Sequence, residues 1–148
     1  ALAQVRDLSN LLRPSVLDDL GLVAALRALA EDFARRTRID VTLDTDGAEG
    51  RFAPDVEVVV YRVVQEALTN IARHAQASRA RVTLRTADGI VTLSVVDDGH
   101  GLPPVASPHL GWLGMQERVT SLGGTLSVSN ADQGGVSVEA SIPAGGPS

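Results

Sequence analysis

The segment over residues 56–75 constrains the fold most, because it could be either a buried strand or a helix until its length is considered. Its many valines favour a strand. Its apolar residues nevertheless recur at intervals of three and four, the spacing of one helix face. These residues are Val60, Val63, Val64, Ala67, Leu68 and Ile71. The pattern continues to Ala75, too far for an ordinary strand, and Pro54 suits a first helical turn. We therefore predict an amphipathic helix over residues 54–75.

The rest of the chain alternates between helical and strand patterns. Helices are predicted over residues 3–12, 22–36 and 113–122, and strands over 41–43, 81–85, 90–97, 125–129 and 136–142. Asp88-Gly89 is typical of a tight hairpin turn. Residues 99–109 include three prolines and are predicted to form a loop. This order predicts an α+β fold: a two-layer α/β sandwich with a mixed, mostly antiparallel sheet and helices on one face.

Composition excludes several classes of site. The chain has 148 residues, enough for one domain with a real core. It has no cysteine, which excludes disulfides and thiol catalysis. All thirteen basic residues are arginine, so a Walker-type phosphate loop and a kinase-type strand lysine are both absent. A net charge of −5 without a basic block argues against nucleic acid or an anionic membrane as partner. The three histidines lack metal-ligand spacing.

One candidate site lies on the predicted central helix. Glu66, Asn70 and Arg73 share a narrow stripe away from the apolar face. A carboxylate and a carboxamide one turn apart are suited to activating a group and holding a metal ion. The alternative is a solvated helix face with paired side chains. Asparagine is a poor helix-interior residue, and Asn70 lies at the edge of the stripe near the core, which weakens that alternative.

A second candidate site is at the end of the strand over 90–97. Alternation places Asp97 on the same face as the apolar residues of that strand, Val91, Leu93 and Val95. An ionised carboxylate facing the core is costly unless something pairs with it. Gly99 and Gly101 would leave room for a ligand there. The alternative is that the strand has already ended and Asp97 begins an ordinary turn, and the local sequence does not decide between the two.

Two glycine pairs are weaker signals. Gly111 and Gly114 flank Trp112-Leu113 at the predicted start of a helix, where free N–H groups and the helix dipole favour a phosphate. A simple helix cap is the more common explanation of such a glycine pair. Gly134-Gly135 would suit a hairpin that needs no ligand.

The order of these motifs resembles the N box and the three glycine boxes of the GHKL ATPase superfamily. The corresponding segments are Glu66…Asn70, Asp97-x-Gly99-x-Gly101, Gly111-x-x-Gly114-Met115 and Gly134-Gly135. More narrowly, the chain resembles the catalytic ATP-binding domain of sensor histidine kinases of the NarL-type (HisKA-3) class. That similarity lies in residues 12–14, 17–22, 65–75 and 113–119. The resemblance extends over nearly the whole chain.

The resemblance implies the Bergerat (GHKL) fold, with ATP between the helices and the sheet under a mobile lid. Asp97 would accept a hydrogen bond from the adenine amino group. Asn70 would ligate Mg²⁺, and Glu66 would be the catalytic residue, as general base or by orienting the attacking group. The residues implied to bind nucleotide are Asn70, Arg73, His74, Asp97, Gly99, Gly101, Leu102, Gly111, Trp112, Leu113, Gly114, Met115 and Gly135.

The chain departs from the family pattern at three points. His109 stands where the family commonly has a glycine, and Val136 stands where a threonine is usual. None of His74, His100 and His109 has the context of a phosphoacceptor histidine. We therefore expect residues 1–20 to be the remnant of a dimerisation helix and its linker, 21–145 the ATP-binding domain and 146–148 a tail. Such a fragment would bind ATP without phosphorylating itself.

The resemblance also implies partners and a location. The partners would be the dimerisation and phosphoacceptor domain of the same protein and a downstream response regulator, without nucleic acid and without direct membrane contact. The location would be cytoplasmic, and the full-length parent could still be membrane-anchored. Two alternative functions stay open: a GHKL serine kinase of the anti-sigma-factor type, and a non-catalytic nucleotide sensor, which Val136 makes plausible.

Overall fold

The computed structural model describes residues 15–45, 52–75, 77–99, 110–131 and 134–144. In chain order the elements are α2 (Ser15–Thr37), β1 (Asp40–Asp44), α3 (Pro54–Asn70), the π-helix η1 (Ile71–Ala75), β2 (Arg79–Ala87), β3 (Ile90–Asp97), α4 (Leu110–Ser121), β4 (Thr125–Asn130) and β5 (Val136–Pro143). The predicted helix over 3–12 and most of the predicted loop over 99–109 lie outside the described residues.

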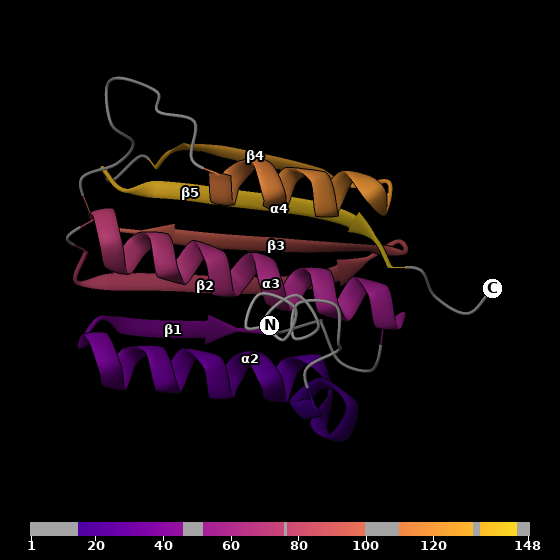
Figure 1. The fold of residues 1–148 in the computed structure, drawn as a ribbon, viewed down its shortest axis with the longest axis horizontal. Coiled ribbons are helices and arrows are strands. Elements are labelled where there is room, and N and C mark those ends of the chain that lie inside the picture. Colours follow the sequence, from indigo (N-terminus) through magenta and orange to yellow (C-terminus); the bar gives the residue numbers. More distant parts are fainter. Residues whose placement is uncertain (1–14, 46–51, 76, 100–109, 132–133, 145–148) are drawn as a thin grey trace, which may run out of the picture.

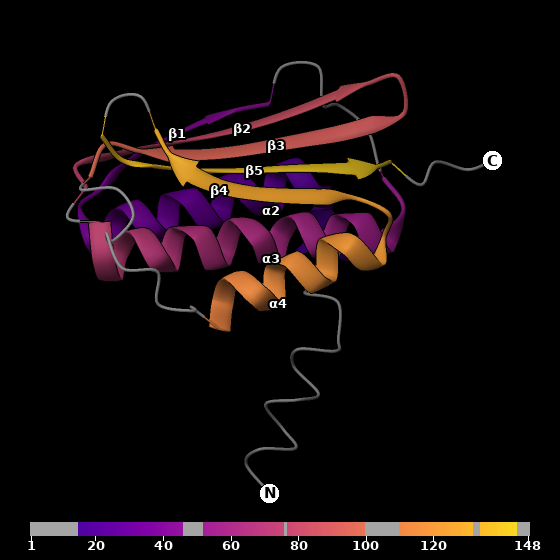
Figure 2. The same ribbon diagram turned by 90° about the horizontal axis from the view of Figure 1, so that it is seen from above.

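The described strands form one sheet in the order β1-β2-β3-β5-β4. β1 is parallel to β2, whereas β2–β3, β3–β5 and β5–β4 are antiparallel. Helices α2, α3 and α4 cover one face of this sheet (Figure 1), and Figure 2 shows the two layers edge-on. The predicted two-layer sandwich with a mixed, mostly antiparallel sheet is confirmed.

Helix α3 is the central element of the core, as its periodicity predicts. Val60, Val63 and Leu68 are buried between the layers, although valine favours strands. Packing against the sheet therefore overrides the local preference. The helix begins at Pro54, and the buried carboxylate of Glu57 accepts a hydrogen bond from the N–H of Phe52 at 3.2 Å, which ties the incoming chain to the first turn.

Helix α2 is broken at Gly21. This residue has φ 85° and ψ 174°, values that interrupt the helix immediately before the predicted start at residue 22. The helical segment before this break begins at Ser15, earlier than the predicted start at residue 22. Leu17 and Leu22, on either side of the break, are both fully buried in the common core. The segment from Ser15 onward therefore packs with the sandwich.

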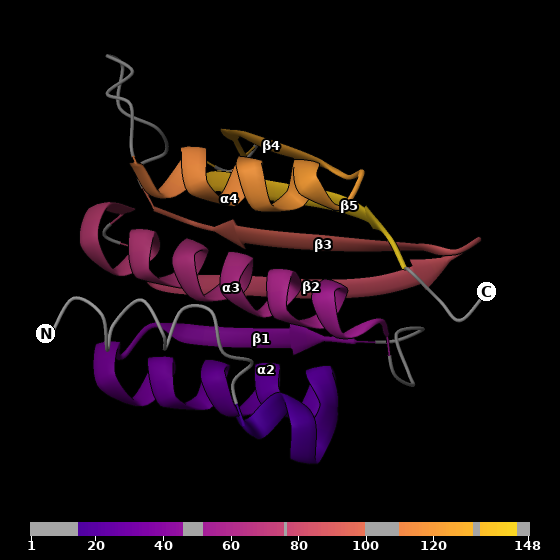
Figure 3. The same ribbon diagram turned by 45° about the vertical axis from the view of Figure 1, so that its right-hand side comes forward.

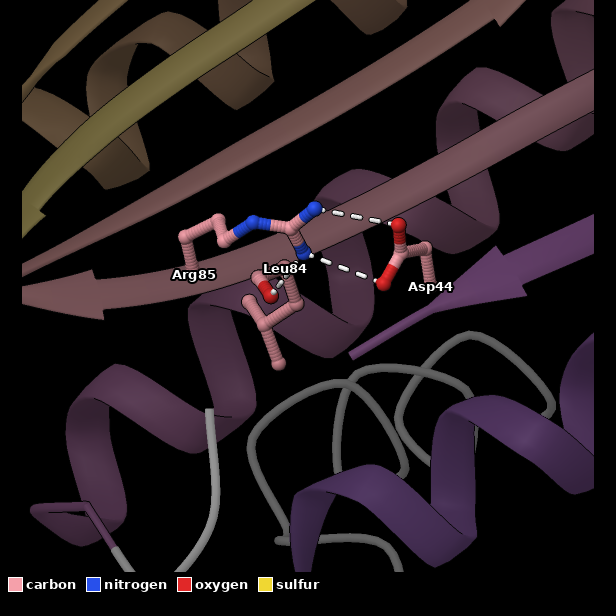
Figure 4. Close-up of polar contacts among 3 residues, drawn as sticks. All are labelled: Asp44, Leu84 and Arg85. Carbon is pink, nitrogen blue, oxygen red and sulfur yellow. Dashed lines mark hydrogen bonds and ion pairs between the residues drawn. The ribbon is translucent and has the colours of Figure 1, made fainter. Parts of the chain in front are cut away.

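The β2–β3 hairpin forms as predicted. Asp88 and Gly89 both have positive φ, 56° and 77°, the type I′ geometry that suits the twist of the flanking strands. On the helix-free face of the sheet, the guanidinium of Arg85 in β2 binds the carboxylate of Asp44 in β1 through two contacts of 3.1 and 3.0 Å (Figure 4). Both side chains are partly exposed, so this pair contributes at most about 1 kcal/mol to stability.

Helix α4 starts three residues before the predicted position, at Leu110. Gly111 and Gly114 therefore lie within its first turns and not ahead of it. It ends at Ser121, one residue before the predicted end, and Gly123 follows with φ 79°. Among the described helices, none combines the length and the apolar character needed to cross a membrane.

Candidate nucleotide-binding site

Four chain segments bring the predicted site residues to one end of the molecule. The last turn of α3 with η1, the end of β3, the start of β5 and the first turn of α4 all lie at the left of Figure 1, and the turned view of Figure 3 agrees. The hairpin turn and the end of β5 lie at the other end. The topology thus gathers segments that are far apart in sequence.

Asp97 is the last residue of β3 and is only 3% exposed. It faces the helices with Leu93 and Val95, so the predicted alternation is confirmed and the alternative of an early strand end is wrong. Its Oδ1 accepts a hydrogen bond from the N–H of Gly99 at 2.8 Å, and Oδ2 is 3.4 Å from the N–H of Val136, a long contact.

The balance of these surroundings raises the pKa of Asp97. Burial raises the pKa most, the hydrogen bonds from Gly99 and Val136 lower it, and the charge of Asp98 raises it further. The ionised carboxylate is therefore less well stabilised than it would be in water. A ligand that donates a hydrogen bond to this carboxylate would compensate for part of that cost.

The start of β5 reaches Asp97 only because residue 135 is glycine. A Cβ at Gly135 would lie 1.8 Å from the carbonyl oxygen of Asp97 and 2.6 Å from its Oδ1. The same turn has Gly134 at φ 103° and is closed by hydrogen bonds of Ala131 with Gly134 (3.0 Å) and with Gly135 (2.6 Å). Gly135 is thus more than a hairpin residue, because it lets the β4–β5 turn support the carboxylate.

On the helix side, Glu66 and Asn70 are half-buried, and Asn70 is the last residue of α3. The Nδ2 of Asn70 is buried and has no hydrogen-bond partner among the described residues. Buried amide groups in native proteins nearly always have a partner. This unpaired N–H donor at the end of the site is therefore suited to a ligand that supplies an acceptor, such as a phosphate oxygen.

After Asn70 the helix widens into η1, which the sequence did not indicate. The N–H of Ile71 bonds to the carbonyls of both Ala67 and Leu68, and the π-helical turn follows. Such turns are frequent at functional sites. The change in helical repeat alters the position of Arg73 relative to the stripe predicted for Glu66 and Asn70. Arg73 is exposed, and the side chain of His74 lies outside the described residues.

Helix α4 contributes its first turn. An added Cβ at Gly114 would meet nothing within 4 Å, so the structure leaves open space beside the backbone there. Leu113 is 55% exposed, whereas Met115 is buried in the hydrophobic core. Gly101, Leu102 and most of the predicted lid lie outside the described residues, as does the side chain of Trp112.

The described residues hold no cluster of three or more His, Cys, Asp or Glu suited to a metal ion. A divalent cation could still fit beside the carboxamide of Asn70, provided that a bound nucleotide supplied phosphate oxygens as its other ligands. The buried acceptor at Asp97 and the unpaired amide at Asn70 are consistent with a ligand that is polar at both ends.

Comparison with known proteins agrees with this arrangement. The family model of the histidine kinase-, DNA gyrase B- and HSP90-like ATPases matches residues 55–146. The sensor histidine kinase MctS of Rhizobium johnstonii is 38% identical across 97% of this chain and 32% of its own length. The oxygen sensor histidine kinase NreB of Staphylococcus carnosus is 39% identical across 94% of this chain and 41% of its own length. The chain thus spans less than half of each of these relatives.

The fold has solved counterparts as well. The blue-light activated histidine kinase of Erythrobacter litoralis superposes with a TM-score of 0.69 at 25% identity, over 83% of this chain and 45% of that protein. The family match covers more than half of the chain and includes α3, β3, α4 and β5, the segments that form the site. The chain therefore belongs to the histidine kinase-, DNA gyrase B- and HSP90-like ATPase family, in which these relatives are sensor histidine kinases.

Proposed function

We propose that this chain is the catalytic ATP-binding domain of a two-component sensor histidine kinase of the NarL-type class. It binds Mg·ATP and donates the γ-phosphate to a histidine on a dimerisation domain. The observation that carries the proposal is the buried carboxylate of Asp97, supported by Gly135 and facing the helices. The two relatives described above, both sensor histidine kinases, support the choice over a serine kinase.

Asp97 accounts for base selectivity. An ionised carboxylate only accepts hydrogen bonds. Adenine presents a donor amino group where guanine presents a carbonyl oxygen. The amino group of adenine therefore compensates the buried charge, whereas the guanine carbonyl would face it as a second acceptor. Gly99, whose N–H donates to Oδ1 of Asp97, has no side chain that would crowd the base.

Residues at the end of α3 would hold the phosphates through Mg²⁺. The carboxamide of Asn70 would supply one ligand to Mg²⁺, whose remaining ligands would be phosphate oxygens and water. When bound, the ion neutralises charge that develops on the phosphates. Glu66 lies one turn earlier and is half-buried, so it could accept the proton of the attacking imidazole or hold that ring in line.

This role requires two partners: the dimerisation domain that carries the phosphoacceptor histidine and a response regulator that receives the phosphate. The observation that separates the proposal from a nucleotide sensor is phosphotransfer. With a separately supplied dimerisation domain, the chain should transfer label from radioactive ATP, whereas a sensor would bind ATP without transfer.

The decisive experiment is calorimetric titration of the chain with Mg·ATP and Mg·GTP. We expect a clear preference for ATP, and about 10- to 100-fold weaker ATP binding in Asp97→Asn, since one charge-assisted hydrogen bond is lost. Asp88→Asn is the matched control, because Asp88 lies at the exposed turn at the other end of the same hairpin. Equal ATP affinity in the wild type and in Asp97→Asn would overturn the assignment.

A further inference from the structure

Asp98 is exposed, yet backbone groups engage its carboxylate closely. Its Oδ1 accepts hydrogen bonds from the N–H of Ser78 at 2.8 Å and from the N–H of Arg79 at 2.9 Å. Its own N–H donates to the carbonyl of Arg79 at 3.2 Å. A single residue therefore joins the end of β3 to the start of β2 through both its side chain and its backbone.

These hydrogen bonds hold the charged carboxylate of Asp98 in place. The N–H groups of Arg79 and Ser78 lower the pKa of Asp98, so the group is ionised at neutral pH. Two successive backbone N–H groups that converge on one oxygen form a small anion site, and here the chain supplies its own anion. An exposed aspartate free of such contacts would be hydrated and move independently of β2.

Ser78 and Arg79 lie where three strands meet. The carbonyl of Ser78 accepts the N–H of Asp40 at the start of β1, at 3.0 Å. Ala80, next in β2, pairs with Asp97 in the sheet register. Ser78 also follows Asn70 by only eight positions, through η1. The contact with Asp98 thus connects the chain leaving the helix side of the site to the strand that carries Asp97.

Asp98 cannot itself contact a nucleotide held between the layers. Successive residues of a strand point to opposite faces, and Asp97 takes the helix-facing side. Asp98 instead holds the backbone next to Asp97. It precedes Gly99, whose N–H holds Oδ1 of Asp97, and it follows the Asp97–Ala80 pair.

We propose that Asp98 is a positioning residue for nucleotide binding: by holding the start of β2 to the end of β3, it fixes the direction of the Asp97 carboxylate. The proposal rests on the proposed function of Asp97. A residue that acts in this way loses its effect on binding once the carboxylate of Asp97 is gone. A residue that only stabilises the fold would weaken binding equally in both backgrounds.

The first measurement needs no nucleotide. Hydrogen exchange by NMR on the 148-residue chain compares Asp98→Ala, Asp98→Asn and Asp88→Asn, the last as a control in the same hairpin. We expect exchange at the N–H of Gly99 to quicken about ten-fold in Asp98→Ala and less in Asp98→Asn, which keeps an acceptor oxygen. Unchanged exchange at Gly99 in Asp98→Ala overturns the proposal even if ATP binding is confirmed.

The second measurement is a double-mutant cycle on ATP affinity. We expect Asp98→Ala to weaken binding about ten-fold in the wild-type background and less than about two-fold in Asp97→Asn. Losses that simply add would identify a general structural role and overturn the proposal. Where Asp98→Ala does not fold, Asp98→Asn carries the cycle, with about three-fold expected. A wild-type chain that binds no ATP overturns the proposed function and this inference together.

Discussion

Replacing Gly135 with alanine tests the site at the point where the structure is least tolerant. The new Cβ would lie 1.8 Å from the carbonyl oxygen of Asp97, 2.4 Å from its carbonyl carbon and 2.6 Å from its Oδ1. Ordinary contacts between such atoms begin near 3.5 Å. The clash is with backbone and with the functional carboxylate, so a change of side-chain rotamer elsewhere cannot relieve it. Either the β4–β5 turn or the end of β3 must move by more than an ångström.

The expected loss has two parts. Overpacking of this kind costs about 1–3 kcal/mol of stability, which for a chain of this length lowers the melting temperature by about 2–12 °C. Displacing Asp97 should also remove its hydrogen bond to the nucleotide and weaken ATP binding by about 10- to 100-fold. The assay combines thermal unfolding with calorimetric titration of Mg·ATP well below the melting temperature.

Gly124→Ala is the matched control. Its Cβ would lie 2.4 Å from the carbonyl oxygen of Ser141 and 3.0 Å from Cγ1 of Val119, so it clashes comparably. It lies between α4 and β4, near the end of β5 remote from Asp97. We expect it to lower the melting temperature while leaving ATP affinity within about two-fold. The reasoning is refuted if Gly135→Ala and Gly124→Ala lose stability equally and still bind ATP with equal affinity.

The remaining predictions concern the chemical step and pH. Glu66→Gln should keep ATP affinity within about two-fold but slow phosphotransfer to a supplied dimerisation domain by roughly 100-fold or more, measured with radiolabelled ATP; normal transfer would remove Glu66 from the reaction. Because folding raises the pKa of Asp97, the stability it contributes is complete below about pH 4 and is lost as pH rises through the folded value. In urea unfolding of the nucleotide-free chain, the free energy of unfolding of Asp97→Asn should therefore rise relative to that of the wild type as pH rises from about 4. The lowered pKa of Asp98 has the opposite effect, but both proteins share it; a difference that is constant with pH would contradict the assigned burial.

Much of this fold follows from local patterns that physical chemistry makes strong. The helix over 54–75 was predicted from a period that only a buried helix face explains, against the preference of its valines. The turn at Asp88-Gly89 was predicted because both positions need positive φ, which these residue types tolerate. Simple alternation places Asp97 on the core-facing side, and the structure decides what the local sequence left open, namely that the strand extends as far as Asp97. In each case the information lies within a few residues of the feature.

The features that sequence reasoning missed depend on distant segments. The resemblance implies that Gly135 binds nucleotide, but its close approach to Asp97 could not be predicted, because it arises from the register in which β5 pairs with β3. The local sequence indicates no role for Asp98, since its partners come from Ser78 and Arg79 at the start of β2. The π-helical turn after Asn70 and the early start of α4 at Leu110 reflect the packing of helix ends, where local preference is weak. Tertiary contact, and not composition, determines these positions.

The described core contains two buried charged residues, and the contrast between them supports the role that we propose for one of them. Glu57 lies in the first turn of α3, where the N–H of Phe52 and the helix dipole favour its charge. Asp97 lies at a strand end, where its hydrogen bonds do not offset burial and its pKa is raised. Its carboxylate can accept a further hydrogen bond, and on the helix side the buried Nδ2 of Asn70 has no partner among the described residues. A ligand that completes both contacts gains binding energy and also stabilises the fold, by about 2.7 kcal/mol at a hundred-fold excess over its dissociation constant. The nucleotide-free domain is thus less stable than its core allows, and the missing stability resides in the residues that we propose to recognise ATP.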